Sequence, residues 1–281
     1  MTYFLSFIIL GFCWVILLWF FWEFFYFFDL LSHFYFLYNI VGIILFCIAI
    51  FKKDIFSIFL SFLLNVFLLF QISHAEVFIW RYEWNADIFY LNSHYFVDES
   101  QAILDEIERV KAKYVMIVEI NEELHKHLSE TFRYHVYHSD RALSMWWYSN
   151  ETLKSAKLHK WSYPFLEVQT REFSALLVHP LPPFTAELSR MQQQNFWEIK
   201  NVYNTLEWNK KLIVWDFNSS YFSQQFQRYF WDMYYKPIYS WGWLGPLRMP
   251  IDYAMWNNSY FEVHSTNLEV SDHLPLLIEL H

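Results

Sequence analysis

Three long apolar runs fill most of the first 72 residues and limit what that part of the chain can form. They cover residues 3–22, 34–51 and 55–72, contain no charged side chain, and approach the ~20 residues that a helix needs to cross a bilayer. A cleaved signal peptide is a poor alternative for the first run, because no basic residue precedes it and two further runs follow it. We therefore predict that residues 1–73 form a membrane anchor of three transmembrane helices.

The few charges between the runs predict the orientation of this anchor. Lys52 and Lys53 are the only basic residues in the first 80 positions, and they lie between the second and third runs. The segment between the first and second runs carries Glu23, Asp29 and His33 instead. Since basic loops stay in the cytoplasm, we predict a multi-pass protein of the cell membrane whose residues 74–281 lie on the extracytoplasmic side.

Residues 74–281 have the composition of one globular domain. Both cysteines, Cys13 and Cys47, lie in the apolar runs, so this domain has no disulfide and depends on its hydrophobic core. The formal net charge of the chain is −9, which argues against a broad nucleic-acid-binding face. An acidic enzyme with a local site and a bound metal is still compatible with DNA cleavage.

Apolar periodicity in residues 74–281 predicts more strands than helices. Residues 114–118 form a continuous apolar run, which is typical of a strand covered on both faces. An apolar stripe along residues 188–206 marks one face of a long helix, with Thr185 as its N-terminal cap. We predict a four-layer α/β/β/α sandwich of two mixed sheets packed face to face. The other expected elements are a helix over residues 100–113 and strands over 87–92, 133–138, 142–148, 173–179, 211–217, 252–256, 260–265 and 274–280.

Two short polar motifs stand at the ends of expected strands. Asp216-Phe217-Asn218 follows an apolar strand, and Ser271-Asp272-His273 precedes the last one. A carboxylate and an amide can hold a metal ion and a phosphate, and an imidazole beside a carboxylate can activate water. Either motif alone is weak, because Asp and Asn are also common turn residues.

Taken together and in this order, the motifs resemble the endonuclease/exonuclease/phosphatase superfamily, whose best-known members are deoxyribonuclease I-like. The resemblance covers roughly residues 87–281 and implies the same two-sheet sandwich. It also implies a metal site in which Glu119 is the metal-binding carboxylate, with Asn92 and Asp272 close by. A carboxylate at the end of a buried strand is costly unless it has a partner, which favours a ligand role for Glu119.

The resemblance assigns the catalytic positions as well. His179 matches a catalytic histidine, and Asp216 and Asn218 match an Asp-x-Asn that orients water and binds phosphate. Asp252 matches the aspartate that pairs with His273, the general base or acid. An aspartate that supports a histidine fixes its tautomer and raises its basicity, so this pair is a sensible dyad. Which of the two histidines acts as acid and which as base stays open.

The implied activity is metal-dependent hydrolysis of a phosphoester by a nuclease, a phosphodiesterase or a phosphatase. Oxygen ligands and the absence of cysteine favour Mg²⁺, with Mn²⁺ as the alternative. The superfamily's substrates include DNA, RNA and phospholipid headgroups, and no protein partner is inferred. A catalytically inactive relative that binds a ligand at the cell surface is the second hypothesis. A structural membrane protein with accidental motifs is disfavoured, because the motifs occur in the family's order.

The sequence departs from the superfamily at Trp215, because the Asp-x-Asn is normally preceded by glycine there. The chain has 15 Trp and only 4 Gly, whereas average glycine usage is about 7%. We hypothesise that some of these tryptophans are glycines in the natural protein, since certain bacterial lineages read UGA as glycine. The alternative is a truly aromatic-rich protein from an AT-rich genome, in which Trp215 crowds the site. The candidate positions are Trp146, Trp147, Trp215, Trp241 and Trp243.

Overall fold

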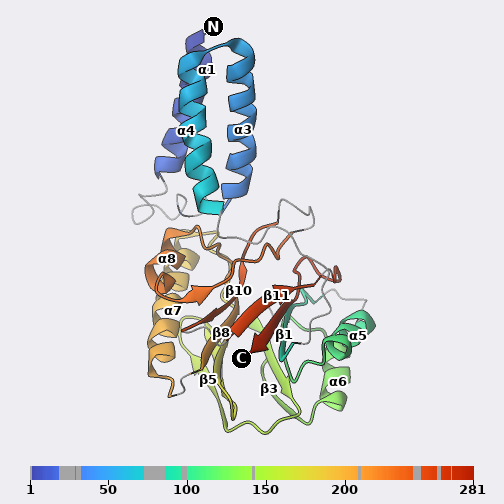
Figure 1. Cartoon of the computed structure of the whole chain (residues 1–281). Helices are drawn as coiled ribbons and strands as arrows, with labels where there is room; N and C mark the ends of the chain where they lie inside the picture. The colour runs from blue at the N-terminus through green and yellow to red at the C-terminus, as the bar shows by residue number, and fades with distance from the viewer. Residues whose placement is uncertain are drawn as a thin grey trace.

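In the described part of the computed structural model, three N-terminal helices project from a two-sheet sandwich (Figure 1). The helices are α1 (Thr2–Leu18), α3 (Tyr35–Lys52) and α4 (Ile55–Ile72). The N-terminus lies at the far end of this projection, and the C-terminus lies in the sandwich. The structure describes residues 2–18, 29, 33–72, 86–95, 100–140, 143–207, 210–242, 248–257, 261–266 and 268–281.

The three N-terminal helices form at the predicted places, but the prediction that they span a membrane is not supported. Within the described residues, no helix is both long enough and apolar enough to cross a bilayer. In their described parts the helices have 17, 18 and 18 residues. The predicted boundary between residues 73 and 74 falls in residues 73–85, outside the described part of the chain.

The first sheet pairs the first strand of the sandwich with the last one. Its order is β11-β12-β1-β2-β4-β3, with β1 and β2 parallel and the other neighbours antiparallel. The apolar runs that predicted β1 and β2 are buried along their whole length. The strands are β1 (Ile88–Asn92), β2 (Tyr114–Val118), β3 (Tyr134–His138), β4 (Met145–Ser149), β11 (Phe261–Ser265) and β12 (Leu276–Leu280).

The second sheet has the same plan. Its order is β5-β6-β7-β8-β10-β9, and β7 and β8 form its single parallel pair. Each sheet is therefore mixed, as predicted, and each has one parallel pair near its centre. The strands are β5 (Ser155–Lys160), β6 (Pro164–Gln169), β7 (Ser174–Val178), β8 (Lys211–Asp216), β9 (Tyr234–Tyr235) and β10 (Asp252–Trp256).

Helices cover the outer faces of both sheets, so the predicted four-layer sandwich is confirmed. α5 (Ser100–Val110) and α6 (Glu122–Thr131) pack on the first sheet, and α7 (Ala186–Thr205) and α8 (Gln224–Phe230) pack on the second. One apolar cluster fills the space between the sheets. The cluster under α7 and α8 also takes in Ile16 of α1 and Leu64 and Leu68 of α4, so the N-terminal helices share a core with the sandwich.

The tryptophans proposed as glycines are packed unevenly. The indole N–H groups of Trp146, Trp147 and Trp215 are buried and have no hydrogen-bond partner among the described residues, although buried indoles normally find one. The rings of Trp215 and Phe217 stack with centroids 2.9 Å apart, closer than the ~3.5 Å at which carbon atoms are in optimal contact. The backbone does not demand glycine at these positions, since none of them has positive φ. Trp243 lies outside the described residues.

Candidate active site

Strand ends from both sheets meet at one edge of the sandwich and carry the predicted site. Asn92 ends β1 and Glu119 directly follows β2, its parallel neighbour. His179 follows β7 and Asp216 ends β8, the parallel pair of the second sheet. Because carboxyl ends of parallel strands share one sheet edge, the four side chains are brought together by topology.

The remaining positions reach the same edge through antiparallel neighbours. Asp252 opens β10 and pairs in register with Asp216 on β8. Asp272 and His273 lie in the loop before β12, which pairs with β1. The loop that holds Asn218 continues from β8. All eight predicted site residues are thus delivered to one place by the sheet order.

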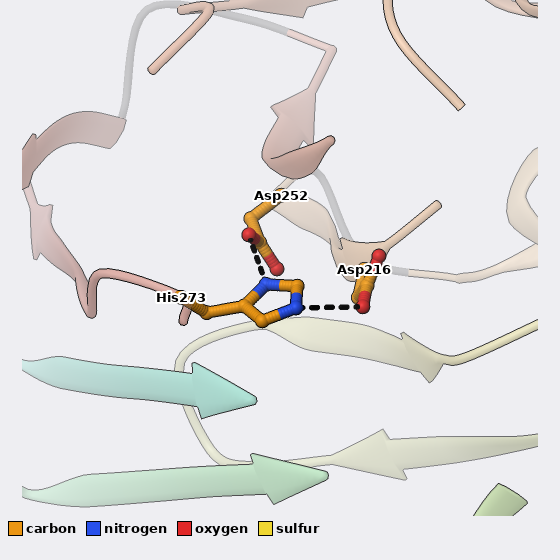
Figure 2. A group of neighbouring side chains, drawn as sticks. All are labelled: Asp216, Asp252 and His273. Atoms are coloured by element: carbon orange, nitrogen blue, oxygen red, sulfur yellow. Dashed lines mark hydrogen bonds and ion pairs between the residues drawn. The ribbon is translucent and has the colours of Figure 1, made fainter. Parts of the chain in front are cut away.

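A buried chain of two aspartates and one histidine forms the centre of the site. Figure 2 shows the imidazole of His273 between the two carboxylates, with Nδ1 toward Asp252 and Nε2 toward Asp216. His273 Nδ1 lies 2.7 Å from Asp252 Oδ2, and His273 Nε2 lies 3.7 Å from Asp216 Oδ2. The three residues are at most 4% exposed. The predicted dyad of Asp252 and His273 is therefore present as geometry.

A second histidine approaches the same aspartate from the other side. His179 Nε2 lies 3.6 Å from Asp216 Oδ2 and 3.2 Å from Glu119 Oε1. The amide of Asn92 ties these carboxylates together, because its Nδ2 donates to Asp216 Oδ2 at 2.8 Å and to Glu119 Oε1 at 3.3 Å. Asp216 therefore lies between two imidazole rings and is held by an amide.

The loop after β8 is fixed by the same aspartate. The backbone N–H of Asn218 donates to Asp216 Oδ1 at 2.9 Å, and its side-chain Nδ2 donates to the Pro180 carbonyl at 2.9 Å. Asn218 and Glu119 have positive φ values of 47° and 54°. Left-handed backbone at residues other than glycine is costly and concentrates at functional sites, where the surrounding contacts hold it.

Opposite charges set the protonation of these buried groups. Burial alone would lower the pKa of His273, but Asp252 and Asp216 outweigh it and raise that pKa to about 9. At His179, burial is likewise outweighed by hydrogen bonds to Asp216 and Glu119, and the pKa rises to about 9. Burial would raise the pKa of Asp216, but the charges of His273 and His179 lower it to about 2. At neutral pH the site therefore holds a carboxylate between two imidazolium rings.

The other buried carboxyl group of the site, that of Asp252, behaves differently from Asp216. Burial raises the pKa of Asp252 above its usual range, and the favourable charge of His273 only partly offsets that effect. Two groups that the sequence analysis did not single out hold this carboxylate. Tyr90 OH donates to Asp252 Oδ1 at 3.4 Å, and Ser240 Oγ donates to Oδ2 at 2.5 Å. Both are buried, so they fix the carboxylate that orients His273.

Two further residues missed in the sequence hold Asp272. His94 Nδ1 lies 2.9 Å from Asp272 Oδ1, and Trp241 Nε1 donates to Oδ2 at 3.0 Å. The backbone N–H of Gly242 donates to the Asp272 carbonyl at 2.8 Å. These residues lie in loops, which have no periodic sequence pattern from which such contacts could be predicted. Trp241 makes a polar contact at the site, unlike the three unpartnered tryptophans.

The residues predicted as metal ligands are chemically suited to Mg²⁺. Glu119 and Asp272 offer carboxylate oxygens, and their side chains remain 16% and 10% exposed. The amide oxygen of Asn92 accepts from the His94 N–H at 3.0 Å, which orients it. Such hard oxygen donors suit Mg²⁺. Among the described acidic and histidine side chains, the buried group whose ligand atoms converge within 4.8 Å is Asp216, Asp252 and His273.

No protein-family model and no curated protein matches this sequence. Solved structures match its fold. A humanized TDP2 of D. rerio has a TM-score of 0.57 at 8% identity, over 68% of this chain and 96% of that one. An AP endonuclease from Archaeoglobus fulgidus has a TM-score of 0.55 at 10% identity, over 69% and 98%.

A third structure with the same fold is described by a family name. An endonuclease/exonuclease/phosphatase family protein from Leptotrichia buccalis has a TM-score of 0.50 at 12% identity, over 69% of this chain and 98% of that one. These identities are too low to carry activity across, so the likeness establishes the fold. The predicted two-sheet sandwich is therefore a fold that this chain shares with these structures.

Proposed function

We propose that this protein is a metal-dependent hydrolase of phosphoesters. The observation that carries the proposal is the buried network in which Asp216 lies between two imidazole rings, each supported by a further carboxylate. A carboxylate flanked by two cationic rings suits a reaction in which water attacks an anionic phosphorus centre. The fold of the sandwich, shared with endonuclease/exonuclease/phosphatase-family proteins, supports the same reaction class.

In this proposal Asp216 orients the attacking water and accepts the proton that the water loses as its oxygen bonds to phosphorus and the bond to the leaving oxygen breaks. That proton then returns to His273, which has given its own proton to the leaving oxygen and whose Nε2 lies 3.7 Å from Asp216 Oδ2. The low pKa of Asp216 keeps it ionised, and the Asn92 amide and the Asn218 N–H fix its two oxygens. His273, protonated and oriented by Asp252, donates its Nε2 proton to the leaving oxygen. His179 and Asn218 stabilise the charge on the non-bridging oxygens.

The proposed metal is Mg²⁺, with Mn²⁺ as the alternative, held by Asn92, Glu119 and Asp272. When bound, it supplies Lewis-acid stabilisation of the charge on the phosphate. Trp241 and His94 then act as supports that orient the Asp272 carboxylate.

The proposal covers three classes of phosphoester substrate. DNA, RNA and phospholipid headgroups are the proposed candidates. The neighbours include a protein named as an AP endonuclease, so DNA is the first substrate to offer. Because the net charge of the chain is −9, we expect the protein to contact DNA at the active site and not along an extended basic surface.

The test is hydrolysis of plasmid DNA and of bis-p-nitrophenyl phosphate by the full chain, with Mg²⁺ and with a chelator. The variant His273→Gln removes the proposed acid. The matched control is His159→Gln, because His159 is also buried and lies 2.8 Å from a carboxylate, Glu167, but sits on β5 away from the site. Mg²⁺-dependent turnover that His273→Gln loses and His159→Gln keeps supports the proposal. Equal turnover in both variants contradicts it.

One observation favours a second candidate, an inactive relative that binds a phosphoester without cleaving it. Trp215 immediately precedes Asp216 and is stacked at 2.9 Å on Phe217. Crowding beside the catalytic aspartate would disturb positions on which hydrolysis depends. Binding of a phosphodiester without turnover, in a chain that gains turnover as Trp215→Gly, would identify this state.

We also propose that the protein is held at a membrane, with the sandwich on the extracytoplasmic side. This proposal is supported by large apolar side chains exposed on the N-terminal helices, among them Phe7, Phe51 and Ile55, which are 76%, 83% and 82% exposed. Fractionation of cells after a carbonate wash tests it, together with protease access to the sandwich in intact cells. Recovery of the chain in the wash without detergent contradicts membrane attachment.

A further inference from the structure

The β8–α8 loop, residues 217–223, carries Asn218 of the proposed site and lies at the junction between the N-terminal helices and the sandwich. Its residues 219–223 are at most 5% exposed. Phe222 packs in the same apolar cluster as Leu64 of α4. Because this loop is buried, its backbone N–H groups need acceptors within the protein.

The backbone N–H of Ser220 has its acceptor in the N-terminal part of the chain. It donates to His33 Nδ1 at 2.9 Å, and Ser220 Oγ lies 2.9 Å from the same nitrogen. His33 is 6% exposed, and burial lowers its pKa to about 4, so the ring is neutral at pH 7 and Nδ1 accepts. Since both residues are buried, loss of the imidazole leaves the Ser220 N–H without this acceptor, which is costly.

Asp29 holds the end of the same loop. Ser223 Oγ donates to Asp29 Oδ2 at 2.8 Å, and the N–H of Gln224, the first residue of α8, donates to Asp29 Oδ1 at 2.7 Å. Figure 1 shows α8 on the side of the sandwich that faces the N-terminal helices. The β8–α8 loop is therefore held from the N-terminal part of the chain at two points, by His33 and by Asp29.

The contact with His33 lies close to the proposed site along the chain. Ser220 is two residues after Asn218, and two residues of extended chain span at most ~7 Å. Asn218 has a φ of 47°, and its N–H donates to Asp216 Oδ1 at 2.9 Å. A left-handed conformation at a residue other than glycine persists only where the surrounding contacts hold it. A shift of Ser220 is therefore transmitted to Asn218.

We propose that His33 is a positioning residue of the active site. By accepting from the Ser220 N–H, it holds Asn218 where the Asn218 side chain stabilises the charge on the phosphate oxygens. His33 does not touch the substrate and acts only through the loop. This inference rests on the proposed hydrolysis, and it gives a residue outside the sandwich a role in that reaction.

The test is steady-state hydrolysis of bis-p-nitrophenyl phosphate by the full chain and by variants at His33. His33→Asn places an acceptor oxygen near the position of Nδ1, whereas His33→Gln places it near that of Nε2 and His33→Leu has none. We expect kcat to fall at least about tenfold in His33→Gln and His33→Leu, with KM within about twofold of the parent, because stabilisation of the transition state is lost.

His33→Asn is the conservative variant, and we expect its kcat to stay within about threefold of the parent's. Equal kcat in His33→Asn and His33→Gln overturns the proposal, as does a change confined to KM. Should His33→Leu fail to fold, the comparison of His33→Asn with His33→Gln carries the test, since both side chains are polar amides.

Thr170→Val is the control for a merely structural effect. Thr170 is fully buried, and its Oγ1 accepts from the backbone N–H groups of Glu172 and Phe173 at 3.1 and 3.0 Å. It precedes β7, at the end of that strand opposite His179. We expect Thr170→Val to unfold at lower urea concentration with unchanged kcat. A fall in its kcat equal to that of His33→Leu overturns the positioning role.

A double-mutant cycle identifies the residue through which His33 acts. Asn218→Ala removes the side chain that His33 is proposed to position. In the Asn218→Ala background, we therefore expect His33→Gln to lower kcat by no more than about twofold. Losses of kcat that multiply in the double variant show that His33 does not act through Asn218, and they overturn the proposal.

Amide hydrogen exchange separates failure of this inference from failure of the hydrolase proposal. We expect the amides of residues 218–220 to exchange faster in His33→Gln than in the parent, with unchanged exchange on β1 and β2, because a contact that protects the loop is lost. A parent chain without turnover overturns the hydrolase proposal, and the exchange rates then decide whether His33 holds the loop. Unchanged exchange in residues 218–220 overturns this inference.

Discussion

The polar edge of the sandwich and the aromatic layer beside it, formed by Trp215, Phe217 and the rings packed on them, differ in how well their side chains are accommodated, although Trp215 and Asp216 are consecutive residues of β8. On β8, Asp216 is held by an amide, a backbone N–H and two imidazole rings. One residue earlier, Trp215 has a buried indole N–H without a described partner and a ring stacked at 2.9 Å on Phe217. At the edge every charged group has a partner, although His179 Nδ1 has none among the described residues, whereas the rings of Trp215 and Phe217 are crowded against each other.

The difference between these two regions shows that buried polar atoms are paired where the site requires them and unpaired at several tryptophans. The buried charges at the edge are tolerable because each has an opposite charge or a donor within reach. The indoles of Trp146, Trp147 and Trp215 add buried polar atoms without partners, which packing alone does not require. Glycine at some of these positions would remove the unpaired donors and relieve the contact with Phe217.

The largest effect is expected from Asp216→Asn. The change removes the negative charge between two imidazolium rings, so water is no longer oriented and hydrolysis should fall by about 10²–10⁴-fold. Steady-state turnover of bis-p-nitrophenyl phosphate measures it. The control is Asp232→Asn, since Asp232 pairs with Lys200 at the surface and is half exposed. Full activity in Asp216→Asn would show that the polar edge is not the catalytic site.

The aromatic layer predicts an unusual result for Trp215→Gly. Truncating a well-packed buried aromatic side chain normally costs about 3–5 kcal/mol of unfolding free energy. Because Trp215 is crowded against Phe217, we expect a loss clearly below that range, together with equal or higher hydrolysis. Urea unfolding and turnover measure the two quantities.

The matched control for this variant is Phe196→Ala in the same cluster. Its ring lies 5.4 Å from that of Trp215, an ordinary edge contact, so it should show the full loss of about 3–5 kcal/mol. Equal losses of unfolding free energy in Trp215→Gly and Phe196→Ala would mean that the Trp215 indole is well packed. The proposed contrast between the polar edge and the aromatic layer would then be contradicted.

The mass of the natively expressed protein tests the origin of the crowding. If some tryptophans are glycines in the natural protein, the intact mass falls below that of the printed sequence by one indolylmethyl substituent for each. Tandem mass spectrometry of the peptide that contains residues 211–217 identifies position 215 directly. A tryptophan there supports the aromatic-rich alternative.

The smallest effect is expected at the junction, where the carboxyl group of Asp29 is buried. Asp29 is 1% exposed, and its oxygens accept from Ser223 Oγ and from the N–H groups of Gln224 and Gln225 at 2.8, 2.7 and 3.3 Å. Burial raises the pKa of Asp29 to about 6, and these hydrogen bonds only partly offset it. The folded state therefore holds this proton more tightly than the unfolded state.

The sign of the pH effect follows. Asp29 contributes most to stability below its unfolded pKa, and that contribution falls as the pH rises through about 6. We expect Asp29→Asn to be less destabilised relative to the parent at pH 7 than at pH 4, by up to about 3 kcal/mol. Urea unfolding at both pH values measures it, with Asp105→Asn on the exposed face of α5 as control. A difference that does not change with pH contradicts the assignment.

Much of the fold could be predicted from the sequence because buried strands appear in it as continuous apolar runs. The apolar runs of β1, β2, β7, β8 and β10 were predicted to within a residue or two, and they are the strands that carry the site. Weakly patterned elements were missed. β5 is largely exposed, and α6 buries only Leu124 and Leu128, so neither has a clear apolar period.

The site divides in the same way. Asn92, Glu119, Asp216 and Asp252 were predicted because the resemblance to the superfamily assigns them, and each stands at an end of a strand that the sequence predicts. His94, Ser240 and Trp241 were missed because they lie in loops, whose contacts depend on how distant segments meet. The prediction of transmembrane helices is not supported, because none of the described helices is both long enough and apolar enough to cross a bilayer.

The most direct test of the central claim is a double-mutant cycle for turnover with Asp216→Asn and His273→Gln in the full chain. If the buried network acts as one catalytic unit, each single variant loses nearly all activity, and the double variant is no worse than either. Losses that simply multiply, or a single variant that retains the parent's turnover, would contradict the account.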